Sequence, residues 1–151
     1  MTAAELLIAI REALAGDTEL ESWCMERFGR APTIALGVDE ENPPQKDEYP
    51  LVAIIDLSQS RGNLQPKNTW EVHLGVGVVN NTVEITGNRK TYPGMLQAEE
   101  MRVLAENAVY RARIAPTSTV SDTYSISSYP LFVSHSYVTF TGLRSSEGGM
   151  P

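Results

Sequence analysis

The sequence predicts a two-layer α+β domain with a mostly antiparallel sheet of four to six strands, N-terminal helices and one long crossover helix. Three patterns predict this class: apolar residues at helical spacing near the start, apolar–polar alternation over 70–78, and good helix formers without proline or glycine over 95–114. Consecutive short strands favour antiparallel pairing, and one long helix can cover a sheet face. The 151 residues suffice for one core and not for two.

Two helices are expected to open the chain. Thr2 and Glu5 have the spacing of a capping box, and Thr18 repeats this signal with the glutamate three positions later. The first helix is expected to end in a left-handed cap at Gly16, and the second helix closes at Gly29. The predicted apolar stripe of the first helix consists of Ala3, Leu7, Ile10 and Leu14.

The pattern changes to β structure after residue 32. A short strand is expected at 33–38, and the almost continuous apolar run at 51–57 is typical of a strand buried on both faces. Alternation over 70–78 predicts a strand whose second face is wet or thinly covered. Residues 39–49 form a charged loop with two prolines, and this loop is expected not to pack.

The last third predicts a helix and two strands. The helix over 95–114 is followed by segments at 120–128 and 131–141 that are rich in Tyr, Val, Thr and Ser, as strands are. We expect one domain over residues 1–144 and a flexible Ser/Gly-rich tail at 145–151.

Charge and composition exclude several classes of function. The net charge is −7, and the first 49 residues carry all of it, with eleven acids and four bases. An acidic chain without a basic run argues against direct nucleic-acid recognition, and no apolar run approaches the roughly 20 residues of a membrane span. The one cysteine, Cys24, cannot form an intramolecular disulfide and is expected to be a small buried hydrophobe.

No pattern predicts catalysis, a metal or a cofactor. His73 and His135 lack a second ligand at zinc spacing and are expected to be partly exposed strand residues. The acids at 39–41 lack the turn glycine of a calcium loop, and no Gly-x-Ser-x-Gly elbow is present. The chain is therefore not expected to be an enzyme. A hydrolase that uses His73 or His135 remains the alternative.

Charged side chains instead suggest contacts between copies of the chain. Five bases lie on or just before the long helix: Arg89, Lys90, Arg102, Arg111 and Arg113. Three acids of the 39–49 loop are their natural counterparts on a neighbouring copy: Asp39, Glu40 and Glu41. Such head-to-tail contacts close into a ring when the rotation permits. The alternative is a solvated helix face and a solvated loop.

The order of elements resembles a family of viral proteins. A short capped helix, Pro-Leu-Val-Ala-Ile-Ile at 50–55, Trp-Glu-Val-His-Leu-Gly-Val at 70–76, a long Glu/Arg/Ala helix and a closing β segment follow one another. Together they resemble tail-terminator (tail-completion) proteins of long-tailed bacteriophages and prophages, over residues 1–142. Neck and head–tail joining proteins share much of this organisation.

The resemblance implies a structural protein. Its subunits would form a homohexameric ring that caps the tail tube, ends polymerisation of the tail tube protein and offers a surface to the head-completion or connector protein. No catalysis and no cofactor are implied. The protein would assemble in the host cytoplasm and remain in the virion tail. A head–tail joining protein, or a small cytoplasmic module that binds a ligand on its open sheet face, are the alternatives.

Overall fold

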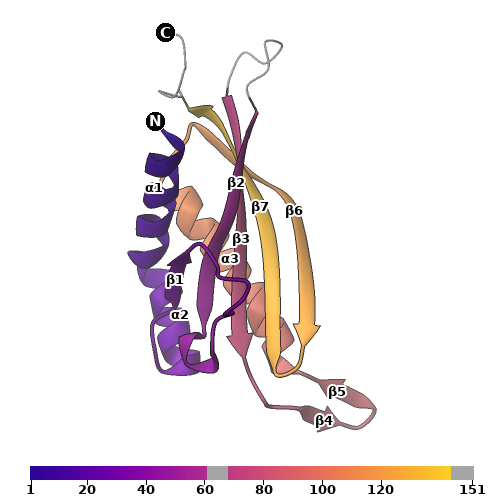
Figure 1. The fold of residues 1–151 in the computed structure, drawn as a ribbon. Helices are drawn as coiled ribbons and strands as arrows, with labels where there is room; N and C mark the ends of the chain where they lie inside the picture. The colour runs from indigo at the N-terminus through magenta and orange to yellow at the C-terminus, as the bar shows by residue number, and fades with distance from the viewer. Residues whose placement is uncertain (61–67, 144–151) are drawn as a thin grey trace.

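The computed structural model describes residues 1–60 and 68–143 and has two layers, a sheet and the helices that cover one of its faces (Figure 1). The strands of the main sheet are β1 (Thr33–Leu36), β2 (Leu51–Ser60), β3 (Asn68–Val79), β6 (Thr117–Ser128) and β7 (Leu131–Leu143). The helices are α1 (Ala3–Ala15), α2 (Thr18–Phe28) and α3 (Pro93–Arg111). In the described chain the strand order is β1-β2-β3-β7-β6, and only the β1–β2 pair is parallel. The predicted α+β class is confirmed.

Helix α1 begins where the sequence predicts and differs in two details. The Thr2 hydroxyl accepts a hydrogen bond from the amide three residues later, at 3.1 Å, as expected for a helix cap. Gly16 has a φ of −95° and is right-handed, so the predicted left-handed cap is wrong. The buried stripe runs through Leu6, Ile10 and Leu14, whereas Leu7, which the predicted stripe contains, is only half-buried.

Helix α2 is capped one residue earlier than predicted. The Asp17 carboxylate accepts a hydrogen bond from the Leu20 amide at 2.9 Å, and its charge suits the positive end of the helix. Gly29 ends α2 in the left-handed conformation, with a φ of 73°. Cys24 is fully buried, and this burial raises the pKa of its thiol to about 12. Its interpretation as a small core hydrophobe is confirmed.

The core lies between the helices and β2, β3 and β7. The predicted inward face of β3 is confirmed, because its apolar positions are almost completely buried: Trp70, Val72, Leu74, Val76 and Val78. The second face is not wet, since His73, Gly75 and Gly77 are buried as well. The double burial predicted for 51–57 holds over 51–54 and ends where the β2–β3 register shifts between Ile54 and Asp56. Phe132, Val138 and Phe140 of β7 complete this side of the core.

The sheet face opposite the helices, here the open face, is partly covered by segment 37–50. This segment contains the short 3-10 helix η1 (Lys46–Glu48) and passes in front of β2 and β3 in Figure 1. Tyr49 packs so closely on Gly77 that a Cβ there would lie 2.7 Å from Tyr49 Cε1. The expectation that the loop does not pack is therefore wrong, because the glycines of β3 leave room for the apolar side chains between its charges.

A hairpin of β4 (Glu84–Thr86) and β5 (Arg89–Thr91), here the arm, forms a separate two-stranded sheet. Figure 1 shows it extending away from one end of the main sheet. Thr86 pairs with Arg89, so the turn consists of Gly87, with a φ of 63°, and Asn88. Two-residue turns of this kind need a positive φ that glycine adopts without strain.

The predicted flexible tail at 145–151 lies outside the described residues, and the predicted domain limit at 144 stays a prediction. Within residues 1–60 and 68–143, no helix has the length and apolar character needed to cross a membrane.

Candidate functional site

The arm carries an exposed apolar side chain beside a positive charge. Ile85 is 71% exposed, more than any other large hydrophobic residue in the described part of the chain. It pairs directly with Lys90, and directly paired residues of antiparallel strands point to the same face. Arg89 directly precedes Lys90 in β5 and therefore points to the other face. The Lys90 ammonium lies 5.6 Å from the Tyr92 ring centroid, within cation–π range.

An apolar groove lies between segment 37–50 and the open face. Val38, Pro44 and Tyr49 line it from the segment, and the sheet contributes Leu51, Ala53, Ile55, Gly75, Val76, Gly77, Val133 and His135. Its volume is about 120 Å³. Small-molecule sites usually measure about 300–1,000 Å³. The groove is therefore too small for a typical small ligand and suits a single apolar side chain.

The acids of the loop, Asp39, Glu40 and Glu41, lie in the chain between Val38 and Pro44, two residues that line this groove. Hydrogen bonds from the Asn42 side chain and from the amides of Glu41 and Asn42 hold the pKa of Asp39 below its usual value. Asp39 thus shapes the turn. Glu40 and Glu41 are exposed, and neither carboxylate has a bonding partner among the described residues.

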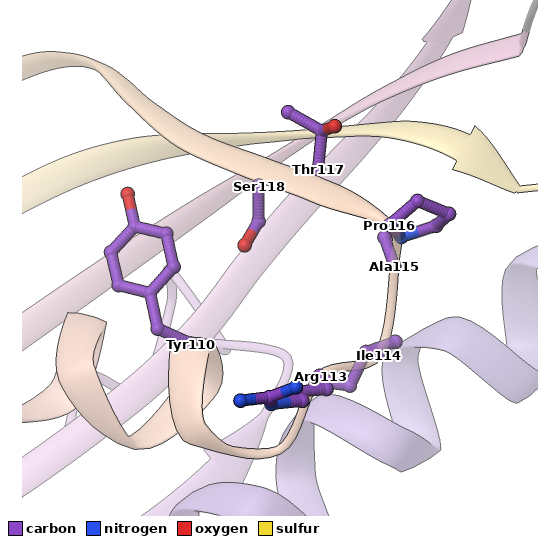
Figure 2. A pocket seen from close by; sticks show the side chains of 7 residues that line it. All are labelled: Tyr110, Arg113, Ile114, Ala115, Pro116, Thr117 and Ser118. Carbon is purple, nitrogen blue, oxygen red and sulfur yellow. The ribbon is translucent and has the colours of Figure 1, made fainter.

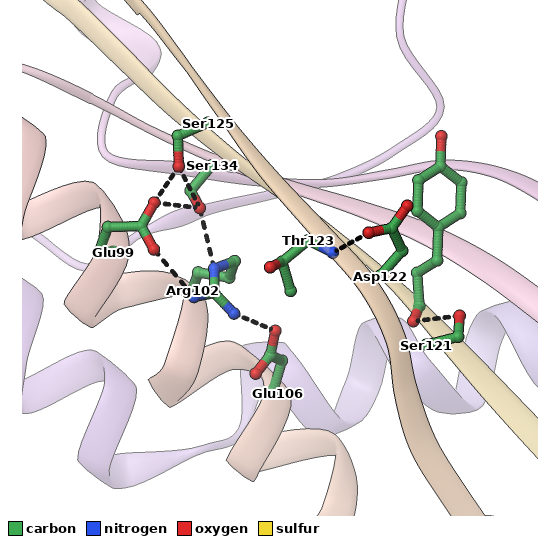
Figure 3. Close-up of polar contacts among 9 residues, drawn as sticks. Glu99, Arg102, Glu106, Ser121, Asp122, Thr123, Ser125 and Ser134 are labelled. Carbon is green, nitrogen blue, oxygen red and sulfur yellow. Dashed lines mark hydrogen bonds and ion pairs between the residues drawn. The ribbon is translucent and has the colours of Figure 1, made fainter.

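Arg102 does not lie on the exposed side of α3, where the sequence suggests it. Its side chain is 15% exposed and points between α3 and the sheet. Figure 3 shows its guanidinium donating to Glu106 at 2.7 Å, to Glu99 at 2.8 Å and to Ser134 at 2.9 Å. The expected surface position is wrong for Arg102, because the turn that buries Met101 also directs Arg102 toward β7. Its charge is neutralised within the subunit.

The other helix arginines have different surroundings. Arg111 donates three hydrogen bonds to the Asp17 carboxylate, at 2.7, 2.8 and 3.2 Å, and pairs with Glu19 at 3.1 Å. Arg113 borders a depression of about 660 Å³ between α3 and β6 (Figure 2). That volume falls in the range of ligand sites. All its lining residues, however, belong to the continuous segment 110–118, the end of α3, the start of β6 and the link between them, so no described residue distant in sequence lines it.

The two histidines, which the sequence suggests are isolated and partly exposed, meet on the open face, where His135 is partly exposed and His73 is buried. His73 Nε2 lies 2.9 Å from His135 Nδ1, so one ring donates a hydrogen bond and the other accepts it. Tyr137 stacks on His73 with centroids 4.4 Å apart, and Tyr124 stacks on His135 at 4.5 Å. The Asp56 carboxylate lies 3.9 Å from His73 Nδ1. Four rings from β3, β7 and β6 thus form one cluster.

In the part of the chain that the structure describes, the histidine pair is accompanied by neither a bonded nucleophile nor a metal-binding group. Among the described residues, no serine or cysteine side chain bonds to either imidazole, and no group of three His, Cys, Asp or Glu residues could hold a metal ion. That the chain is not an enzyme stays a prediction. The pairing escapes sequence analysis because the histidines are 62 residues apart and meet only through the β3–β7 register.

His135 makes stability depend on pH. Burial lowers its pKa below the ordinary value of 6.5, and the neighbouring His73 lowers it further. As the pH falls through about 6.5, the unfolded chain gains a proton at this position before the folded chain does. The free energy of unfolding is therefore expected to decrease between about pH 7 and pH 5. The pKa of Glu99 is also lowered, but from 4.5, so its titration lies below this window.

Urea unfolding at several pH values checks this expectation. His135→Gln removes the titrating ring and should flatten the dependence on pH within the window, whereas Glu99→Gln should leave it in place. Equal pH slopes for the wild type and His135→Gln would contradict the assignment.

The charges of this region are visible in the sequence, whereas its apolar parts are not. Ile85 and the groove are absent from the predicted site. The turn Gly87-Asn88 between short β-prone segments is the signal that could reveal the arm. The arm brings Arg89 and Lys90 together on one protrusion, away from Arg102 and Arg111. In comparisons with known proteins, no family model matches this chain and no curated protein matches it.

Proposed function

We propose that this chain is a structural subunit that assembles into a ring, caps the tail tube of a long-tailed phage or prophage, ends tube polymerisation and offers a surface for joining the head. The proposal combines the resemblance in the order of elements with two surface features, the exposed arm and the apolar groove. The ring is expected to be a hexamer, to assemble in the host cytoplasm and to remain in the virion tail.

The arm is the observation that carries the proposal. An isolated two-stranded hairpin is marginally stable in water, and this one exposes an isoleucine at its centre. A partner that covers Ile85 removes apolar surface from water and also stabilises the hairpin. The arm and the groove are different surfaces, so copies that join through such surfaces do so head to tail, as a ring requires.

Strand β6 supports the proposal independently. In the described chain, its 12 residues lie at the outer edge of the sheet, and eight consecutive residues, 121–128, are exposed. An open strand edge of this length is a template for pairing with another chain. A capping subunit needs one surface that binds the last tube ring and another that does not bind further tube subunits.

The first test is the mass and shape of the purified full chain. Light scattering and negative-stain imaging are expected to show an annulus with about six times the subunit mass of 16.6 kDa. Raising the salt concentration should weaken it, because the Debye length falls from about 8 Å at 0.15 M to 3 Å at 1 M. A monomer at all concentrations would overturn the proposal.

The second test addresses the capping function. Adding the ring to polymerising tail tube protein from the same phage is expected to shorten the tubes and to leave a ring at one tube end in electron micrographs. A neck protein would bind the connector and leave tube length unchanged. Unchanged tube length together with connector binding would therefore replace tail termination by head–tail joining.

A further inference from the structure

We propose that the arm of one copy docks on the groove of the next copy, with Ile85 inserted beside Tyr49 and Lys90 facing Glu40 and Glu41. This inference rests on the proposed self-assembly and names the contact that would carry it. Three features support this contact: the shape of the arm, the apolar lining of the groove and the acids of the 39–49 loop.

The shape of the arm fits an insertion. Ile85 lies at the middle position of the three-residue strand β4, opposite the middle position of β5. Its side chain therefore stands at the centre of one hairpin face. Lys90 shares that face, whereas Arg89 lies on the opposite one. A partner that accepts this face must provide an apolar recess for one branched side chain and negative charge within reach of one lysine.

The groove provides the recess. Its volume of about 120 Å³ is that of a few water molecules, at about 30 Å³ each in the liquid. Its lining is apolar apart from Tyr49, His135 and the backbone, so water inside it finds few hydrogen-bond partners. Replacing such water by an aliphatic side chain is favourable. Gly77 keeps the floor low, since a Cβ at this position would meet Tyr49.

The charges select this groove over the larger depression. Glu40 and Glu41 follow the groove residue Val38 by two and three positions and lack bonding partners in the described chain, so both can pair with an incoming lysine. The depression at the end of α3 is instead bordered by Arg113, which repels Lys90. Of these two hollows in the described chain, only the groove combines an apolar recess with acids a few residues away in the chain.

The contact joins two copies. Figure 1 shows the arm pointing away from the main sheet, whereas the groove lies on the open face under segment 37–50. An arm directed away from its own subunit leaves that subunit's groove free for a neighbour. Each copy then donates one arm and accepts another, which is a heterologous contact.

Single substitutions at both halves of the contact test it in the purified full chain. Ile85→Asp and Val38→Asp are expected to raise the concentration at which half of the protein assembles by about tenfold or more, as buried interface anchors do. Ile8→Asp is the matched control, because Ile8 is 45% exposed on α1, away from both surfaces. All three positions are exposed, so circular dichroism should show unchanged folds.

Two charge-reversal variants of the arm, at Lys90 and at Arg89, test the charged part of the contact. Lys90→Glu should weaken assembly more than Arg89→Glu, because only Lys90 shares the face of Ile85. Combining Lys90→Glu with Glu40→Lys and Glu41→Lys in one chain should restore assembly. Equal effects of the two arm substitutions, without restoration, would overturn the charged half of the contact.

Mixing two assembly-defective variants gives the sharpest result. Ile85→Asp retains an intact groove and Val38→Asp an intact arm, so the mixture should form two-chain complexes that neither variant forms alone. A wild-type ring that persists with Ile85→Asp would overturn this inference and leave the proposed function standing. A ring that needs Ile85 but does not stop tube growth would support this inference and overturn the proposed function. A wild-type chain that stays monomeric would overturn both.

Discussion

Replacing Arg102 by alanine is expected to lower the free energy of unfolding by about 2–4 kcal/mol, somewhat less than for a fully buried ion pair because Glu99 is partly exposed. Three nitrogens of the guanidinium bond to Glu99, Glu106 and Ser134 beneath the sheet. Without the cation, the Glu106 carboxylate, whose side chain is 10% exposed, remains in a poorly hydrated position with no opposite charge. Urea unfolding followed by circular dichroism measures the loss.

The pKa of Glu99 supports this view of the network. Burial by itself raises that pKa, but hydrogen bonds from Ser125, Arg102 and Ser134 outweigh the burial and hold it below its usual value. The carboxylate is thus stabilised in its ionised form by the groups that surround it.

Two further variants make this prediction specific. Arg11→Ala removes an exposed pair with Glu12 and should cost only about 0–1 kcal/mol. The double variant Arg102→Leu with Glu106→Leu removes both charges and should recover part of the stability, because apolar pairs often replace buried ion pairs without loss. A loss for Arg102→Ala as small as for Arg11→Ala would show that the network contributes little.

Gly94→Ala is expected to lower the free energy of unfolding by about 1–3 kcal/mol, although alanine is normally the better helix former. The added Cβ would lie 2.4 Å from Phe132 Cδ2 and 3.1 Å from the Asn80 Cβ. Phe132 is 2% exposed and packed in the core, so its ring has little room to move. The first turn of α3 would have to shift away from the sheet. Thermal or urea unfolding gives the size of the loss.

A second variant that removes the clash with Phe132 is the control for Gly94→Ala. Phe132→Leu removes the ring atoms that the new Cβ meets, so Gly94→Ala should cost less in this background than in the wild type. Additive losses from the two substitutions would contradict the steric explanation. Gly77→Ala offers a contrast, because the half-buried Tyr49 on the loop can move aside. That variant should preserve stability better and instead change the groove.

Local patterns predict the elements of this fold, and long-range pairing explains what they miss. The inward face of β3 and the cap at Thr2 depend on neighbouring residues, and both are confirmed. The cap of α2 lies at Asp17, one position before the predicted Thr18, because the carboxylate competes with the hydroxyl for the helix amides. The buried stripe of α1 contains Leu6 and not the predicted Leu7, because the helix is rotated slightly.

In the candidate site, too, local features could be predicted from the sequence and long-range features could not. The charges Asp39, Glu40, Glu41, Arg89 and Lys90 are visible in the sequence as local clusters. The burial of Arg102, the contact of His73 with His135 and the groove all depend on strand register and on the path of segment 37–50. Such properties arise from residues far apart in the chain, so no short window of sequence contains them.

The position of β7 has a consequence for synthesis in the cell. The last strand of the described chain fills the middle of the sheet, between β3 and β6, and pairs with residues that are made more than 50 positions earlier. While β7 is still inside the ribosome, the emerging chain exposes the unpaired edge of β3 and cannot close its core. Closure of the sheet must therefore wait until β7 has emerged, and chains terminated before β7 are expected to be substrates for chaperones and proteases.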